Sequence, residues 1–98
     1  MEKNICVKVL FFAKIKEMLE RSFEYINLNE NVKLKEIYEI IINKIDFSKL
    51  LINENQLRQE FERCLLAKDD EYCMNKPDEV ITIKEGSIIS VIPPISGG

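Results

Sequence analysis

Apolar residues follow two different periods along this 98-residue chain. Residues 5–12 and 87–92 are extended stretches, apolar at most positions of both faces, which is typical of strands with neighbours on each side. Residues 22–28 continue the extended pattern. Residues 32–45 change to helical spacing, which predicts the main helix. Its apolar face consists of Leu34, Ile37, Tyr38, Ile41, Ile42 and Ile45.

The remaining segments predict shorter elements. Residues 13–21 carry apolar side chains at helical spacing, and the polar residues 27–31 supply turn and cap chemistry for the main helix. Residues 46–63 predict a second helix capped by Ser48, with Leu50, Leu51, Leu57 and Phe61 on its apolar face. Further strands are expected at 64–67, 71–74 and 80–83, with turns at 68–70 and at Glu85-Gly86.

This order of elements predicts an α+β fold. A mixed sheet packs on one main helix, and the first and last strands lie beside each other in its centre, because both are apolar on most positions. The length suits one domain, which we expect over residues 1–94. Residues 95–98 are expected to form a flexible tail that carries two glycines.

The tail holds the most informative residues of the chain. Gly97 and Gly98 are two of only three glycines, and they follow the rigid pair Pro93-Pro94. Proline cannot continue a strand ladder, so Ile95, Ser96, Gly97 and Gly98 should extend beyond the fold. An ordinary frayed terminus is the alternative. Ile92 and Ile95 are the first candidates for contact with a partner, although Ile92 could equally pack in the core.

Composition narrows the possible functions. The net charge of −3 argues against nucleic acids and anionic membranes as partners.

The cysteines indicate the cellular setting. There are three, without C-x-x-C spacing, and the sequence has no recognisable signal peptide or membrane span, which together indicate a reducing, cytosolic setting. Cys6, Cys64 and Cys73 are expected to be small buried hydrophobes, with thiol chemistry left open at Cys73. Metal binding is disfavoured because histidine is absent.

No motif in the chain predicts an active site or a bound cofactor. Glycine-rich phosphate loops and nucleophile elbows are absent from the sequence, and a hairpin turn explains the clustered Asp69, Asp70 and Glu71. The reacting group can instead be the Gly98 carboxylate, activated as a mixed anhydride by another protein. Glycine suits this role, since without a Cβ the tail fits a narrow channel and leaves the acyl carbon open to attack.

Two segments carry a resemblance to a known family. Residues 9–13, Val-Leu-Phe-Phe-Ala, and residues 91–98, Val-Ile-Pro-Pro-Ile-Ser-Gly-Gly, resemble the small subunit of molybdopterin synthase, a sulfur carrier with a ubiquitin-like β-grasp fold. The likeness runs over the full length. One departure lies in the turn before the last strand, where Gly86-Ser87-Ile88 replaces the usual Gly-Asp-Glu. Another is Ile92, where bacterial relatives often have an aromatic residue, so this side chain is expected to pack more weakly on a partner.

The resemblance implies a non-catalytic subunit that works in two steps. An ATP-dependent adenylyltransferase, similar to ubiquitin-activating enzymes, would adenylate Gly98, and a sulfurtransferase would supply the sulfur of a thiocarboxylate. The tail, residues 93–98, would then enter the large synthase subunit and give its sulfur to cyclic pyranopterin monophosphate. The synthase would be a heterotetramer of two small and two large subunits.

Three other functions fit the same sequence features. A related sulfur carrier for tRNA thiolation or thiazole synthesis would share the fold and Gly97-Gly98. A protein modifier would attach its terminal glycine to substrate lysines. A purely structural interaction domain would have a tail without chemistry. The Phe11-Phe12-Ala13 run and the two prolines favour the molybdopterin branch.

Overall fold

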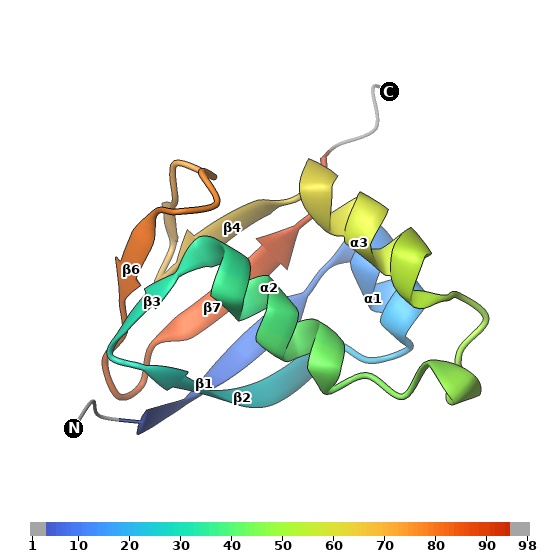
Figure 1. The fold of residues 1–98 in the computed structure, drawn as a ribbon, viewed down its shortest axis with the longest axis horizontal. Coiled ribbons are helices and arrows are strands. Elements are labelled where there is room, and N and C mark those ends of the chain that lie inside the picture. Colours follow the sequence, from blue (N-terminus) through green and yellow to red (C-terminus); the bar gives the residue numbers. More distant parts are fainter. Residues whose placement is uncertain (1–3, 95–98) are drawn as a thin grey trace.

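The computed structural model describes residues 4–94, which fold around a five-stranded mixed sheet (Figure 1). The strands are ordered β2-β1-β7-β4-β5, and β3 and β6 form a separate two-stranded sheet. β1 and β7 are parallel neighbours, with Phe11 paired to Val91. The strands are β1 (Asn4–Phe11), β2 (Phe23–Asn29), β3 (Asn31–Lys33), β4 (Leu65–Lys68), β5 (Glu71–Tyr72), β6 (Val80–Thr82) and β7 (Ile88–Ile92).

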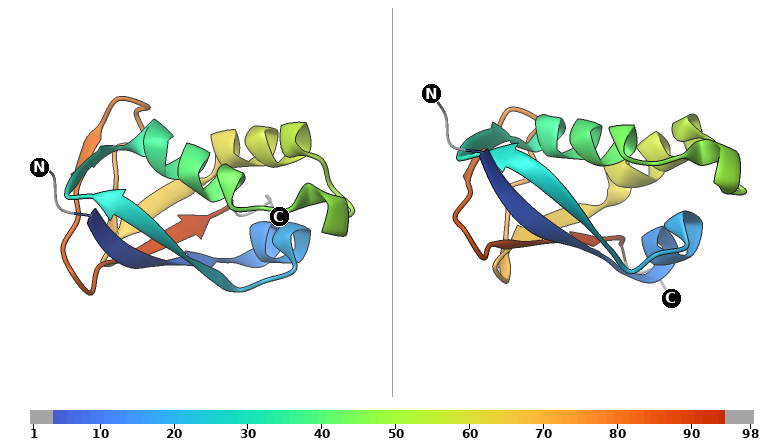
Figure 2. Two further views of the ribbon diagram at one scale, coloured as in Figure 1. Left: turned by 60° about the horizontal axis from the view of Figure 1, so that its bottom comes forward. Right: turned by 90° about the horizontal axis from the view of Figure 1, so that it is seen from below.

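Helices cover one face of this sheet. Helices α2 (Leu34–Asn43) and α3 (Glu54–Arg63) lie on the same side, as Figure 2 shows, and α1 (Ala13–Leu19) lies near α3 at the end of β1. A short 3-10 helix, η1 (Phe47–Lys49), links α2 to α3. The α+β prediction, with the first and last strands adjacent in the sheet, is confirmed.

The core lies between the helices and the covered face of the sheet. Alternation along β1 places Ile5, Val7, Val9 and Phe11 in this core, each at most 3% exposed. The intervening Lys8 and Leu10 are only half-buried and Cys6 is exposed, because none of the helices within residues 4–94 covers the other face. This second face, called the open face below, is where the sequence analysis expected apolar burial.

Helix α2 begins two residues later than predicted. Val32 pairs with Ile81 in the small β3–β6 sheet, so the chain is still extended there. The predicted capping by residues 27–31 is wrong: Lys33 is the N-cap residue and its side chain makes no capping bond. The backbone N–H groups of Leu34 and Lys35 instead donate to the carbonyl oxygens of Glu79 and Pro77, at 2.9 and 3.1 Å.

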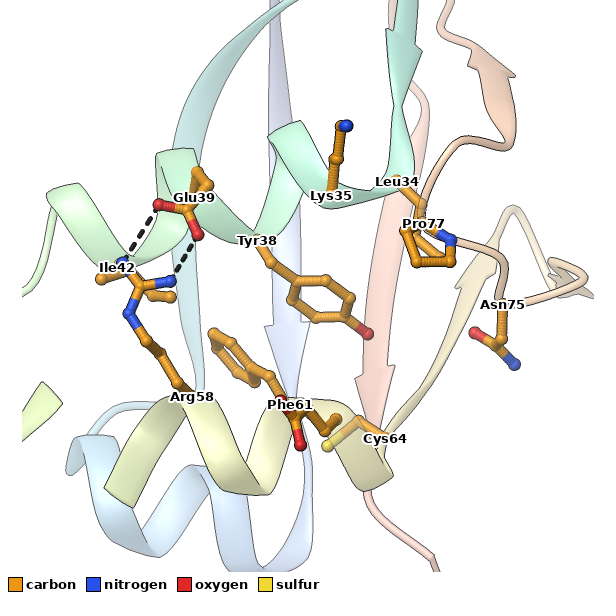
Figure 3. Close-up of a pocket in the computed structure, with 11 residues that line it drawn as sticks. Leu34, Lys35, Tyr38, Glu39, Ile42, Arg58, Phe61, Cys64, Asn75 and Pro77 are labelled. Atoms are coloured by element: carbon orange, nitrogen blue, oxygen red, sulfur yellow. Dashed lines mark hydrogen bonds and ion pairs between the residues drawn. The ribbon is translucent and has the colours of Figure 1, made fainter. Parts of the chain in front are cut away.

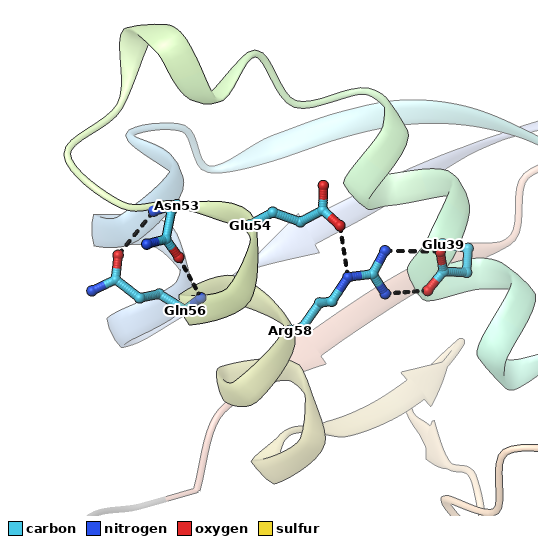
Figure 4. A network of polar contacts seen from close by, with 5 residues as sticks. All are labelled: Glu39, Asn53, Glu54, Gln56 and Arg58. Atoms are coloured by element: carbon cyan, nitrogen blue, oxygen red, sulfur yellow. Dashed lines mark hydrogen bonds and ion pairs between the residues drawn. The ribbon is translucent and has the colours of Figure 1, made fainter.

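Helix α3 is shorter than the predicted segment and is capped by a different residue. Asn53 Oδ1 accepts from Gln56 N at 2.9 Å, and Gln56 Oε1 accepts from Asn53 N at 2.8 Å. This reciprocal capping box, drawn in Figure 4, replaces the predicted Ser48 cap. Leu51 lies outside the helix and is 98% exposed, whereas its neighbours Leu50 and Ile52 pack against the core.

The three cysteines differ in burial. Cys64 is buried, as predicted, and its thiol donates to the Glu60 carbonyl oxygen at 3.2 Å. Cys73 is half-buried against the core. Cys6 is exposed, so the prediction of a buried side chain is wrong there. Cys6 lies between the buried Ile5 and Val7 on β1, so alternation turns its side chain to the open face.

Candidate functional site

The chain leaves the sheet at the end of β7. Ile92 is the last residue of the strand and is half-buried, Pro93 is buried, and Pro94 is exposed. The strand stops here because proline has no N–H for the ladder. The predicted tail residues Ile95, Ser96, Gly97 and Gly98 lie outside the described residues, and the roles assigned to them stay predictions.

Three apolar side chains surround this point on the open face: Phe12, Leu65 and Ile92, which we call the tail-base patch. Leu65 pairs with Ile92 across β4 and β7, so both side chains point to the same face. Phe11 pairs with Val91 and points to the covered face. Alternation therefore turns the next residue, Phe12, to the open face. Phe12 is 43% exposed and Leu65 is 42% exposed.

A left-handed residue fixes the direction of the chain after Phe12. Ala13, the first residue of α1, has a φ of 49°, which is uncommon for a residue other than glycine. Phe12 itself remains extended, with φ −125° and ψ 153°. The sharp turn from β1 into α1 therefore lies directly after Phe12, beside the end of β7.

The apolar surface continues from the tail-base patch along the open face to β2. Leu10 pairs with Phe23, and Lys8 pairs with both Tyr25 and Ile88, so these side chains share one face. Lys8 Nζ lies 4.6 Å from the centre of the Phe23 ring, and the Phe23 and Tyr25 rings meet edge to face at 5.6 Å. Contiguous exposed apolar surface of this kind marks interaction sites.

The sequence analysis found only Ile92 of this surface. The missed residues are Phe12, Phe23, Tyr25, Leu65 and Ile88. Alternation within β2 could have indicated two of them, since Phe23 and Tyr25 have the opposite phase from the buried Ile26 and Leu28. The exposure of Phe12 and Leu65 depends on which face the helices cover, and no local pattern gives that.

The turn before β7 is held by one of its own side chains and by one from the β4–β5 turn. Gly86 has a φ of +85°, where glycine is favoured. The hydroxyl of the buried Ser87 accepts from Lys84 N at 3.0 Å. Asp69 Oδ1 accepts from Ile88 N at 2.9 Å, so the β4–β5 turn is tied to the start of β7. Asp69 and Asp70 have positive φ, which confirms the predicted hairpin turn.

Several titratable groups within residues 4–94 are engaged in packing or in ion pairs. Burial raises the pKa of the Cys64 thiol to about 12, with a further contribution from Glu60. Burial also raises the pKa of Cys73. Lys14 Nζ lies 3.1 Å from the buried Glu60 carboxylate, which links α1 to α3. In this part of the chain no cluster of three or more His, Cys, Asp or Glu residues could hold a metal ion.

The sequence profile of the ThiS family matches residues 9–98. The chain belongs to the ThiS family. Two relatives of this ThiS-family chain are molybdopterin synthase sulfur carrier subunits. The one from Anopheles gambiae is 32% identical over 97 residues, covering 97% of this chain and 94% of the relative. The one from Dictyostelium discoideum is 32% identical over 99 residues, covering 93% and 94%.

Solved structures agree with the fold of this ThiS-family chain. One is a complex of subunits 1 and 2 of molybdopterin-converting factor from Helicobacter pylori. The matching chain is 25% identical, with a TM-score of 0.55, and the match covers 95% of this chain and 99% of the chain in the complex. Small archaeal modifier protein 1 from H. volcanii is 10% identical, with a TM-score of 0.63, covering 93% and 99%. The latter likeness concerns the fold alone. Among the described helices, none has the length and apolar character needed to cross a membrane.

Proposed function

We propose that this chain is the sulfur carrier subunit of a molybdopterin synthase. The observation that carries the proposal is the 32% identity to sulfur carrier subunits over nearly the full length of both chains. The similarity to a chain in a complex of two molybdopterin-converting factor subunits supports a large-subunit partner. The chain itself would be non-catalytic and would act in the cytosol.

The proposed reacting group is the Gly98 carboxylate. One carboxylate oxygen attacks the α-phosphate of ATP in the activating enzyme, pyrophosphate leaves, and an acyl adenylate forms. A hydrosulfide ion supplied through a sulfurtransferase then attacks the acyl carbon, AMP leaves, and the terminus becomes a thiocarboxylate. Its sulfur is the softer and stronger nucleophile, and it would attack cyclic pyranopterin monophosphate in the large subunit. Gly97 and Gly98 add no side-chain bulk beside the reacting carbon.

The open face would supply the docking energy that the tail lacks. Ordering residues 95–98 in a partner's channel costs roughly 1–2 kcal/mol per residue, so the tail alone cannot bind tightly. The tail-base patch lies where the chain leaves the fold, and burying it on a partner would hold Pro93 and Pro94 at the channel entrance. Two small subunits bound in this way to a dimer of large ones give the proposed heterotetramer.

Intact-mass analysis tests the proposed chemistry directly. The chain is incubated with a molybdopterin-pathway activating enzyme, ATP and a sulfurtransferase with its sulfur source. We expect one oxygen to be exchanged for sulfur, located at Gly98 by fragmentation. Deletion of Gly98 should abolish the exchange and change the free energy of unfolding by less than about 0.5 kcal/mol, because removing one terminal glycine takes away no side chain. Leu51→Ala, at an exposed site outside the tail, is the control.

The sulfur acceptor distinguishes this function from its alternatives. Addition of the large subunit and cyclic pyranopterin monophosphate should yield molybdopterin and return the chain to its carboxylate form. Transfer of sulfur only to tRNA or to a thiazole precursor would contradict the proposal, and so would a stable bond from Gly98 to protein lysines. An unmodified terminus under all conditions would favour an interaction domain without chemistry.

A further inference from the structure

A cavity between α2 and α3 has no role in the proposed sulfur transfer. Its volume is about 390 Å³, and its walls come from the two helices and from the loop after β5 (Figure 3). Apolar side chains form most of the lining, including Leu34, Ile42, Phe61 and Pro77. The cavity belongs to the helical layer, on the other side of the sheet from the open face. A ligand bound here would not compete with a partner bound to the open face.

An ion-pair network spans one end of this cavity. The Arg58 guanidinium on α3 donates two hydrogen bonds to the Glu39 carboxylate on α2, and Arg58 Nε donates to Glu54 at 2.8 Å (Figure 4). The bidentate pair sets the separation of the two helices at this point. The charges of the network are therefore already paired with each other.

The rim of the cavity offers no free cation for an acidic ligand. Lys35 Nζ lies 3.1 Å from the Asp78 carboxylate, and Arg58 is shared between two glutamates. Glu62 adds a further negative charge to the lining. An anionic ligand would meet this acid without an unpaired base among the described lining residues. The mostly apolar lining also makes burial of a cation costly, so the site favours an uncharged molecule.

The interior presents an aromatic surface and one unsatisfied hydroxyl. The Tyr38 and Phe61 rings are 4.7 Å apart at 35°, and Figure 3 shows the Tyr38 hydroxyl directed toward the side formed by Cys64, Asn75 and Pro77. This hydroxyl is buried and has no hydrogen-bond partner within residues 4–94. Burial raises the pKa of Tyr38, so the group stays protonated at neutral pH and keeps a proton to donate.

We propose that this interhelix cavity is a binding site for a small, uncharged, planar aromatic molecule that carries a hydrogen-bond acceptor. The ligand packs against the Tyr38–Phe61 ring pair and, after a small shift of the Tyr38 side chain, accepts a hydrogen bond from its hydroxyl, which is buried without a ligand. The volume of the cavity lies in the lower part of the range of small-molecule sites, which suits a ligand of one or two rings. The proposal goes beyond sulfur transfer and does not depend on it.

Quinoline is a suitable probe, since it is planar, uncharged at pH 7.5 and has one ring-nitrogen acceptor. We titrate it into the full, isotope-labelled chain and follow backbone amide shifts by NMR. We expect saturable shifts confined to residues of the cavity, such as Ile42 and Phe61. Tyr38→Phe, which keeps the ring and removes the hydroxyl, should weaken binding about 3- to 10-fold, the usual range for one hydrogen bond. Tyr25→Phe on the open face should leave the affinity unchanged.

Two results would overturn the proposal. One is the lack of saturation up to the solubility limit, or shifts concentrated on the open face. The other is equal affinity of the Tyr38→Phe variant and the wild-type chain, which would remove the role of the hydroxyl. Ile42→Phe, which adds bulk to the cavity wall, should abolish binding, and urea unfolding verifies that each variant is folded.

Discussion

The covered and open faces of the sheet use the same kinds of residue for different purposes. Ile88 and Ile89 are neighbours on β7, yet Ile88 is 41% exposed on the open face and Ile89 is fully buried against the helices. Leu65 and Leu66 on β4 repeat this contrast. Apolar area on the covered face stabilises the fold, whereas apolar area on the open face is available for a partner. Residue type alone therefore does not separate stability from recognition.

Ile89→Ala and Ile88→Ala give the largest expected contrast. Ile89→Ala leaves a cavity in the core and should lower the free energy of unfolding by about 2–5 kcal/mol. Ile88→Ala removes a side chain that is already partly in water, so we expect a loss below about 1 kcal/mol. Urea unfolding of both variants measures the difference. Equal losses would mean that the open face is also packed in solution.

Leu65→Ala and Leu66→Ala extend the contrast from stability to binding. Leu65 belongs to the tail-base patch, so its truncation should weaken binding to a molybdopterin synthase large subunit about tenfold, or roughly 1.4 kcal/mol, at nearly unchanged stability. Leu66→Ala should mainly lower the free energy of unfolding. Calorimetric titration and urea unfolding give the two quantities. Wild-type affinity in the Leu65→Ala variant would exclude this patch from the interface.

The covered face was largely predictable from the sequence, because its signals are local and periodic. The helical spacing from Leu34 to Ile42 marks the buried side of α2. Val7 and Val9 of β1 are buried as the apolar pattern predicted, although that pattern did not separate their face from the opposite one. The start of α2 was misplaced because Val32 pairs with Ile81, a contact between residues far apart in sequence that no local pattern encodes.

The candidate site was less predictable than the core. Two glycines after two prolines led to the prediction of a reactive tail, and residues 95–98 of that tail lie outside the described residues. The exposure of Phe12 was not predictable, since it is the same residue type as the buried Phe11 beside it. Only the placement of the helices over one face decides which of the two meets solvent. Recognition surfaces on a sheet thus become visible only when the layers are known.

Cysteine reactivity provides a smaller contrast between the two faces. Cys6 on the open face should be alkylated first by iodoacetamide at pH 8, because its side chain is exposed. Cys64 should react last, since it is buried and its raised pKa keeps the thiol protonated. Mass spectrometry of peptides at successive times gives the order. In urea the three thiols should react at similar rates, and a retained order there would show that local sequence controls reactivity instead.

The smallest effect should come from the ion pair at the outer surface of the helical layer. The hydrogen bonds from Arg58 lower the pKa of the Glu39 carboxyl below its ordinary value of 4.5. The pair therefore stabilises the fold above that value, and this contribution is lost as the pH falls through the lowered pKa. Both side chains are partly exposed, so we expect a loss smaller than in either core variant, and one that high salt removes. At low salt, Glu39→Gln should reduce the fall in the free energy of unfolding as the pH is lowered. The control is Glu62→Gln, because Glu62 makes no ion pair within residues 4–94, and this change should leave the acid part of the profile as it is. Identical acid limbs for Glu39→Gln and the wild-type chain would show that packing alone, without this pair, holds α3 on α2.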